Sequence, residues 1–418
     1  MAGIAISKAG AATSGLPRYA LFGGVLAAAG LPIYIHAPKF YVDEYGVGLG
    51  ALGAVLFALR LVDVVQDPAL GWLAEATRGA RGAAAAIAGC AMAVAMLALF
   101  AVAPPVAPLP WFAGSLLVLF SAFSFLTITF YAQGVAKARD LGAQGHLRVA
   151  AWREGGALIG VCAAAAAPAA LMAVTDAPFA AFALIFAAAA LAAVLAMRPE
   201  WHGAARAVSL TGFATLLGDR TARRLLVLAL VNSAPVAVTS TLFLFFVESR
   251  LMAAGSSGPL LIVFFLAAAA SVPAWSRAAA RLGAKPALMA AMALAILSFG
   301  FAALLGPGDV ALFAVICLAS GAAVGADLTL LPAIFARRIA AMGGAEGQAF
   351  GLWAFMTKFT LAIAAVALLP ALEAAGFRSG TDNPQAALML LTALYALLPC
   401  VLKLVAIALL AATPVEET

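Results

Sequence analysis

Charged residues are scarce in this chain. Asp, Glu, Lys and Arg make up 10% of its 418 residues, whereas 66% of the residues are apolar, and the mean hydropathy is +1.09. A water-soluble domain needs a charged surface that this composition cannot supply. The composition therefore predicts an all-α polytopic membrane protein.

The short motifs of common enzyme classes are also missing. The sequence has no H-E-x-x-H run, no G-x-S-x-G run, no Cys and His pair and no Gly-rich phosphate loop. Its four cysteines lie within apolar segments at no metal-like spacing, which indicates packing rather than metal binding. We therefore expect neither an enzyme nor a cofactor.

Long apolar runs, by contrast, recur along the whole chain. Each is long enough to cross about 30 Å of hydrocarbon as a helix, and together they predict twelve transmembrane helices, the first of which is retained because no cleavable signal peptide is visible. The predicted spans are 17–38, 50–76, 83–103, 111–138, 147–173, 178–197, 224–248, 258–280, 285–305, 309–336, 346–372 and 385–412.

Lys and Arg are distributed unevenly over the ends of these spans. One set of ends and loops carries most of the 24 basic residues, and the other set has only Lys39, Arg250 and Arg378. The positive-inside rule then predicts an inner-membrane protein with both termini in the cytoplasm. The net charge of +6 follows from this asymmetry, and because the basic residues are scattered over loops, no nucleic-acid partner is expected.

The longest connection between spans divides the chain into two halves. It is a basic stretch that follows the sixth span, so the expected organisation is an N-terminal six-helix half (1–197), a cytoplasmic middle loop (198–223) and a C-terminal six-helix half (224–418). Two six-helix halves are the plan of the major facilitator superfamily. We therefore predict that fold.

The second span carries charges that need an explanation. Arg60, Asp63, Gln66 and Asp67 lie within an otherwise apolar run, and one carboxylate at the centre of a spanning helix costs roughly 2.5 to 3.5 kcal/mol on insertion scales. Asp63 and Asp67 are four residues apart, so they share one helical face, with Arg60 close to it. The pattern favours oxygen ligands for an alkali cation or carboxylates for a proton. A salt bridge that only locks helix packing is the alternative.

Five further ionisable residues are expected at membrane depth. Arg153 and Glu154 fit an interfacial ion pair or gate as well as a substrate contact. Asp327 and Lys358 lie deep in their spans, where a functional role is the default expectation. Lys403 can snorkel to one membrane face or pair within the bundle.

The balance of these charges also favours a cation. Four acids face three bases when Lys403 is left out, so one monovalent cation would neutralise the interior. The acids are Asp63, Asp67, Glu154 and Asp327, and the bases are Arg60, Arg153 and Lys358.

The run LRLVDVVQDPALGWLAEATRGARG (59–82) resembles the signature of the glycoside, pentoside and hexuronide cation symporters. Three further segments, 127–154, 232–251 and 346–358, are similar to other parts of that family in the same order. The resemblance covers nearly the whole chain and implies a sodium- or proton-coupled sugar symporter. It also implies the fold's usual monomer.

By resemblance, Asp63 and Asp67 bind the cation, with oxygens added by Gln66 and Thr127. Arg153 would bind sugar hydroxyls, and Lys358 would link the cation site to the eleventh helix. The acidic residues that hold the galactoside in the family's melibiose transporters are replaced here by Ala27 and Phe130, so a different polar cavity is expected. Its candidate residues for substrate binding or coupling are Arg60, Arg153, Lys358, Asp327, Tyr131, Gln133, Trp353 and Tyr34.

These observations predict a symporter that imports a small polar solute, a sugar or a glycoside, across the lipid bilayer by alternating access. Two other roles fit the same fold. Relatives of this family include lysolipid transporters, so an amphiphile carrier is one alternative. A receptor or assembly factor that transports nothing is the other.

Overall fold

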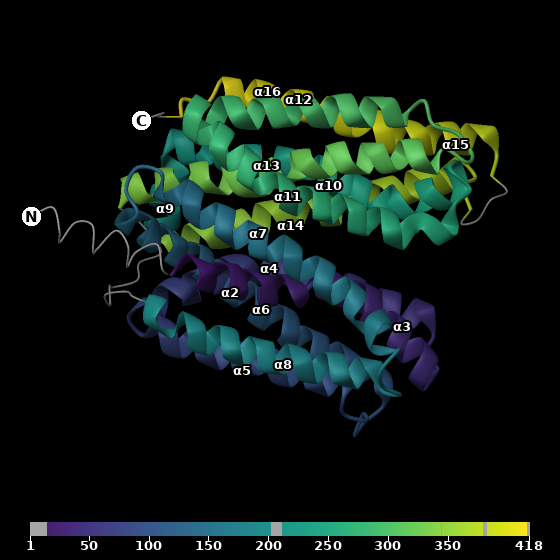
Figure 1. Ribbon diagram of the computed structural model, residues 1–418, viewed down its shortest axis with the longest axis horizontal. Coiled ribbons are helices and arrows are strands. Elements are labelled where there is room, and N and C mark those ends of the chain that lie inside the picture. Colours follow the sequence, from purple (N-terminus) through teal and green to yellow (C-terminus); the bar gives the residue numbers. More distant parts are fainter. Residues whose placement is uncertain (1–14, 202–210, 344, 379–382, 416–418) are drawn as a thin grey trace, which may run out of the picture. The chain divides into compact units, whose positions relative to one another are not determined.

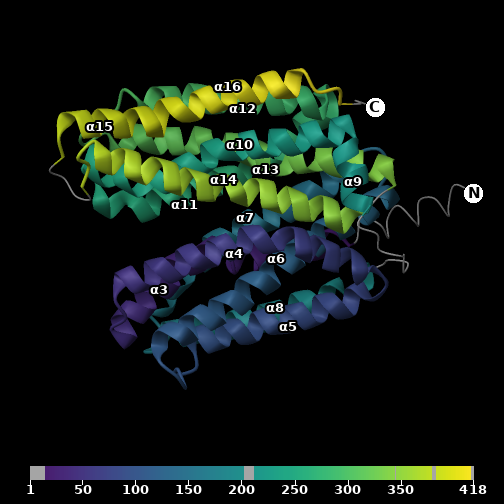
Figure 2. The ribbon, with the colours of Figure 1, turned by 180° about the vertical axis from the view of Figure 1, so that it is seen from behind.

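The computed structural model describes residues 15–201, 211–343, 345–378 and 383–415, and within these ranges the regular secondary structure is helical (Figures 1 and 2). The chain divides into two compact units. Unit 1 comprises Met1–Thr215 and Ile339–Phe355, and unit 2 comprises Leu216–Arg338 and Met356–Thr418. Part of the predicted middle loop, 202–210, lies outside the described residues.

In its described residues, unit 1 contains seven principal helices and the adjoining ends of two helices that it shares with unit 2. The seven are α2 (Leu16–Ala28), α3 (Leu31–Tyr45), α4 (Leu49–Ala76), α5 (Arg81–Phe100), α6 (Pro108–Asp140), α7 (Gly145–Leu171) and α8 (Pro178–Met197). The shared helices are α13 (Val310–Met342) and α14 (Glu346–Ala374), which contribute residues 339–355 to unit 1.

Unit 2 contains the remainder of α13 and α14 and the other C-terminal helices. These are α10 (Arg220–Phe245), α11 (Ser257–Leu282), α12 (Ala284–Ala302), α15 (Gln385–Thr392) and α16 (Leu398–Ala411). Two π-helical segments, Phe246–Arg250 and Ala393–Leu397, extend α10 and join α15 to α16. A short helix, α9 (Thr211–Gly218), leads into unit 2.

Among the described residues, ten helices are long and apolar enough to cross a membrane, and they correspond to the predicted spans three to twelve. The first two predicted spans coincide with helices that do not meet that measure. The second span is α4, which has 28 residues and carries the polar positions noted above. The first span is broken rather than continuous: α2 ends at Ala28 and α3 begins at Leu31. Gly30 has non-helical dihedrals, φ −89° and ψ −116°, and Pro32 lacks an N–H donor for the preceding turn.

Glycine allows two helices of unit 1 to pack at backbone distance. A Cβ atom on Gly156 of α7 would lie 2.0 Å from the carbonyl oxygen of Ala20 on α2, and one on Gly160 would lie 2.1 Å from that of Gly24. Small residues have this role in membranes, where lipid supplies no hydrophobic drive for helix association. The contact fixes α2 against α7.

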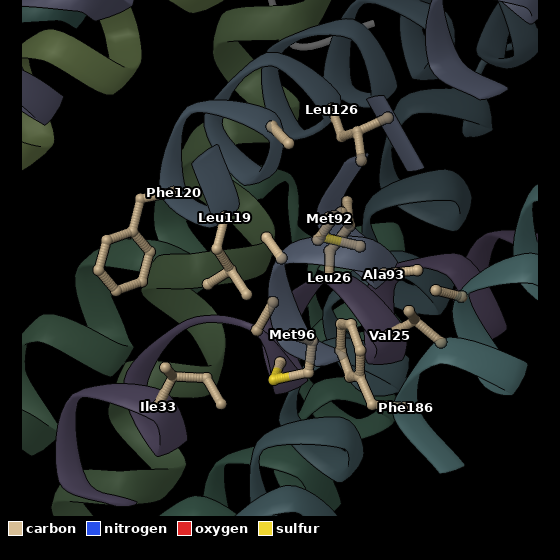
Figure 3. Packing of buried hydrophobic residues seen from close by; sticks show 14 of the residues in the cluster. Val25, Leu26, Ile33, Met92, Ala93, Met96, Leu119, Phe120, Leu126 and Phe186 are labelled. Atoms are coloured by element: carbon tan, nitrogen blue, oxygen red, sulfur yellow. The ribbon is translucent and has the colours of Figure 1, made fainter. Parts of the chain in front are cut away.

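Larger apolar side chains fill the rest of the unit 1 core. Met92 and Met96 of α5 are buried with Leu119 of α6 and Phe186 of α8 (Figure 3). In the ribbon views, α5 and α8 run side by side (Figures 1 and 2).

We expect Gly156→Ala to destabilise unit 1, because the added methyl group cannot avoid the α2 backbone. Gly155→Ala is the matched control: its Cβ would meet nothing within 4 Å, and alanine is favoured over glycine in a helix by up to about 1 kcal/mol. Thermal melting of the detergent-purified protein should show a lower melting temperature for Gly156→Ala only. Equal melting temperatures of the two variants would contradict the close contact.

The start of α10 is held by an acidic N-cap. Asp219 Oδ1 accepts a hydrogen bond from the Ala222 backbone N–H at 2.7 Å, and both carboxylate oxygens accept hydrogen bonds from Arg338 of α13, at 3.1 and 2.5 Å. Hydrogen bonding to Arg338 is the largest cause that lowers the pKa of Asp219 below its ordinary value of 3.8. The ionised Asp219 carboxylate therefore stabilises the fold at pH values above 3.8.

Asp219→Asn should keep the helix cap, since Asn caps as well as Asp, but it should lose the ion pair with Arg338. At pH 6 we expect a lower melting temperature than wild type. The difference should shrink as the pH falls below about 4, where the unfolded carboxylate takes up a proton, and it should close once the pH passes the lowered pKa of the folded carboxylate. A pH-independent difference in melting temperature would show that the charge of Asp219 is not what stabilises this helix start.

Candidate functional site

The polar residues of α4 meet a line of hydroxyl groups on α6. The amide nitrogen of Gln66 donates to Asp63 Oδ1 at 3.0 Å, and the hydroxyl of Ser121 donates to Gln66 Oε1 at 2.9 Å. Ser124 donates to Asp67 Oδ1. Asp63 is 9% exposed and Asp67 is fully buried. We call Asp63, Gln66, Asp67, Ser121 and Ser124 the α4–α6 cluster.

Ser121 and Ser124 were not predicted from the sequence. With the predicted Thr127 they repeat every three residues along α6, which places them on one face of that helix. Thr127 donates its hydroxyl to the Phe123 carbonyl of the same helix at 2.8 Å, and its oxygen keeps acceptor capacity. This periodicity of hydroxyl groups within an apolar span is the signal that could have identified the two serines.

Glycine also permits a close backbone contact beside Asp67. A Cβ atom on Gly351 of α14 would lie 2.8 Å from the carbonyl oxygen of Asp67, and one on Gly71 would lie 2.8 Å from that of Gly347. These residues belong to unit 1. The first turns of α14 thus pack directly against the α4–α6 cluster.

A second polar group in unit 1 joins α6 to α7. Glu154 Oε1 accepts hydrogen bonds from the Tyr131 hydroxyl and from Arg153 Nε, both at 2.7 Å. The guanidinium carbon of Arg153 lies 3.4 Å from the centroid of the Tyr131 ring, in position for a cation–π interaction. Arg153 and Glu154 are buried and balance each other in charge, while Tyr131 is partly exposed. The group brings the predicted Tyr131 and Arg153 together.

Tyr131→Phe tests the hydrogen bond within this group, because it removes the hydroxyl but keeps the ring beneath Arg153. A hydrogen bond to a charged group contributes roughly 1.5 to 3 kcal/mol, so the free energy of unfolding should fall by about that amount. Tyr45→Phe on α3 is the control, since no hydrogen bond to the Tyr45 hydroxyl is seen among the described residues. Equal denaturant midpoints of wild type and Tyr131→Phe would contradict the assignment.

The other predicted residue on α6, Gln133, lies in a network at the Arg-rich ends of the unit 1 helices. Its Oε1 accepts from Arg81 at 2.8 Å, and its Nε2 donates to the Glu200 carbonyl at 2.5 Å. The Glu200 carboxylate is bound by Arg18 at 3.0 Å and by Lys137 at 2.8 Å. The structure therefore places Gln133 among these ion pairs and not with Tyr131 and Arg153.

The first turn of α14 is tied to the same end of unit 1. Glu346 binds Arg78 at 2.6 Å and Arg139 at 3.2 Å, and Arg78 also binds Glu75 at 3.0 Å. Glu75 accepts the Gly347 backbone N–H at 3.1 Å. The segment Glu75 to Arg81, part of the run that resembles the symporter signature, thus supplies ion pairs around α14.

Asp327 of unit 2 pairs with a residue that the charge count left out. Lys403 Nζ donates to Asp327 Oδ2 at 2.5 Å and to Asn232 Oδ1 at 2.6 Å. Lys403 is 3% exposed, so it pairs within the bundle instead of snorkelling. With Lys403 included, the whole-chain excess of one negative charge disappears. Within unit 1, Arg153 pairs with Glu154, and Arg60, Asp63 and Asp67 lie on successive turns of α4.

The remaining candidates are spread over both units. Arg60 lies on α4 one turn before Asp63, and Trp353 is nearly buried on the part of α14 that belongs to unit 1. Lys358 lies further along α14, in unit 2. Tyr34 belongs to α3, but its side chain lies outside the described part of the chain. The predicted link between Lys358 and the cation site stays a prediction.

Comparison with known proteins identifies the fold and the family. The family described as "MFS/sugar transport protein" matches residues 19–417. Among solved structures, a bacterial homologue of the iron transporter ferroportin, in an outward-facing state with soaked iron, has a TM-score of 0.70 at 13% identity; the match covers 94% of this chain and 98% of that one.

A sugar symporter and an organic anion transporter also have this fold. A structure of the E. coli fucose:proton symporter FucP has a TM-score of 0.66 at 15% identity over 96% of this chain and 98% of its own. The human organic anion transporter MFSD10 has a TM-score of 0.61 at 18% identity over 93% and 98%. At these identities the likeness concerns the fold alone, and the predicted major facilitator superfamily fold is confirmed.

Proposed function

This chain belongs to the MFS/sugar transport protein family, and on that basis we propose that it is a cation-coupled symporter that imports a sugar or a glycoside. It is an integral membrane transporter and not an enzyme. The excess of Lys and Arg at one set of helix ends supports an inner-membrane location with both termini in the cytoplasm. The working form is a monomer.

The observation that carries the proposal is the α4–α6 cluster. It brings two buried carboxylates, one amide and two hydroxyl groups together within a spanning segment, and oxygen atoms of these kinds are the ligands that hard cations prefer. Asp63 and Asp67 lie one turn apart on α4, so their carboxylates can bind a sodium ion or a proton together.

Coupling then follows from linkage. Cation binding at Asp63 and Asp67 favours the conformation that accepts the solute, and the solute must strengthen cation binding by the same factor. Joint occupancy permits closure, and the empty carrier returns by alternating access. The solute site includes the group of Tyr131, Arg153 and Glu154, whose donors and acceptors suit sugar hydroxyls.

Asp63→Asn and Asp67→Asn should abolish uphill uptake, because each amide keeps the size of the carboxylate but removes its charge. Accumulation in proteoliposomes under an inward sodium or proton gradient should fall to the level of protein-free vesicles. Asp43→Asn on α3 is the control, since that carboxylate is 58% exposed. Accumulation by both site variants at the wild-type level would refute the coupling role.

A second candidate function is the carriage of an amphiphile such as a lysolipid. An apolar groove of about 470 Å³ between α4, α5 and α6 supports it; Leu73, Ile87 and Val118 are among its lining residues. Ser121, which also lines the groove, bonds to Gln66 of the α4–α6 cluster. Competition by lysolipids but not by sugars for uptake in proteoliposomes would favour this function over sugar import.

A further inference from the structure

Unit 2 encloses a polar group of its own at the depth where α10, α13 and α16 meet. Asp327, Lys403 and Asn232 are 7%, 3% and 5% exposed. Lys403 Nζ donates to Asp327 Oδ2 at 2.5 Å and to Asn232 Oδ1 at 2.6 Å. We call these three residues the unit 2 triad. Asn232 and Asp327 lie near the middle of their helices.

The helix that carries Lys403 changes its winding before it reaches the triad. The π-helical segment Ala393–Leu397 precedes α16, and its Tyr395 stacks on Phe246 of the π-helical extension of α10, with ring centroids 4.2 Å apart. A π-helical turn shifts the register of the residues that follow, and such turns are frequent at functional sites. The stack anchors α10 to this helix on one side of the triad.

One oxygen of the triad has no partner. Asp327 Oδ1 is enclosed, and among the described residues no group donates a hydrogen bond to it. A buried acceptor in this condition is costly, so an ion pair selected only for packing would be expected to satisfy it. The triad instead has an unused acceptor, one unused N–H of Lys403 and the amide N–H groups of Asn232 as donors.

The net charge of the triad restricts what it can bind. Asp327 and Lys403 cancel, so a cation or an anion would leave an uncompensated charge in a low-dielectric interior. A hydroxyl group is neutral, donates one hydrogen bond and accepts others. It therefore matches the free acceptor and the free donors together.

We propose that the unit 2 triad binds a hydroxyl group of a neutral, polyhydroxylated solute, with Asp327 Oδ1 as its acceptor. The inference rests on the proposed function, and it assigns unit 2 a share in solute recognition while the α4–α6 cluster serves the cation. Because Oδ1 is enclosed in this conformation, the hydroxyl reaches it in another conformation of the transport cycle.

The main test combines the double variant Asp327→Asn/Lys403→Met with equilibrium counterflow of neutral sugars in proteoliposomes. The double variant stays charge-balanced, so its melting temperature and its response to sodium should remain close to wild type. The KM for the transported sugar should rise at least about tenfold, since charge-assisted hydrogen bonds are lost. Ser298→Ala on α12, which removes a buried hydroxyl bonded only to the Leu294 carbonyl within the described residues, should leave the KM unchanged.

Monodeoxy analogues of the transported sugar make the test direct. For the wild type, one analogue should bind at least about tenfold more weakly than the parent sugar. For the double variant, the same analogue should bind almost as well as the parent sugar, because the missing hydroxyl and the missing carboxylate belong to one contact. Asn232→Ala keeps the ion pair, and it too should raise the KM. It provides the same comparison if the double variant does not fold.

Three results would overturn the inference. An unchanged KM in the double variant would show that the ion pair of Asp327 and Lys403 serves helix packing only. If every deoxy analogue lost the same affinity for the wild type and for the double variant, Asp327 would not contact a hydroxyl group of the sugar. If wild-type protein exchanged none of the neutral sugars, the proposed function would fall as well, and that outcome is recognised without any variant.

Discussion

A charge within the hydrocarbon region has no water to solvate it, and the polar interior of this protein is arranged around that constraint. Each buried ionisable group whose contacts are described above has a hydrogen-bond partner within the protein, and for most of them that partner lies on another helix. Asp67 accepts from Ser124 of α6, Glu154 from Tyr131 and Arg153, and Asp327 from Lys403. Because such partners must be held at hydrogen-bonding distance, the helices that carry them cannot pack in arbitrary registers.

The polar groups of the two units differ in composition, and this difference separates their chemistry. In unit 1, α4 carries two carboxylates one turn apart, Asp63 and Asp67, and carboxylates are ligands that hard cations prefer. The unit 2 triad cancels internally and keeps a free acceptor, which suits a neutral donor. A transporter that couples a cation to a neutral solute needs both kinds of site. The close glycine contact of α14 beside Asp67 connects backbone packing directly to the α4–α6 cluster.

Several elements were accessible from the sequence because they depend on local composition. Hydrophobic length located α5 to α8 and α10 to α14, and the four-residue spacing of Asp63 and Asp67 predicted that they share a face of α4. The break between α2 and α3 was not anticipated, because Gly30 and Pro32 lie in an apolar run whose hydropathy hides the backbone change. Ser121 and Ser124 were overlooked since serine is ordinary within membrane helices.

The sequence by itself determined that this chain is a bundle of membrane helices and that charges on α4 require a polar environment, because the transfer of side chains into lipid depends on residue type alone. Only the tertiary structure decided which groups meet. Lys403 and Asp327 are 76 positions apart, and the solute candidate Gln133 bonds to Arg81 and to the Glu200 carbonyl. Pairing across helices depends on their register and rotation, which the packing of the whole unit sets.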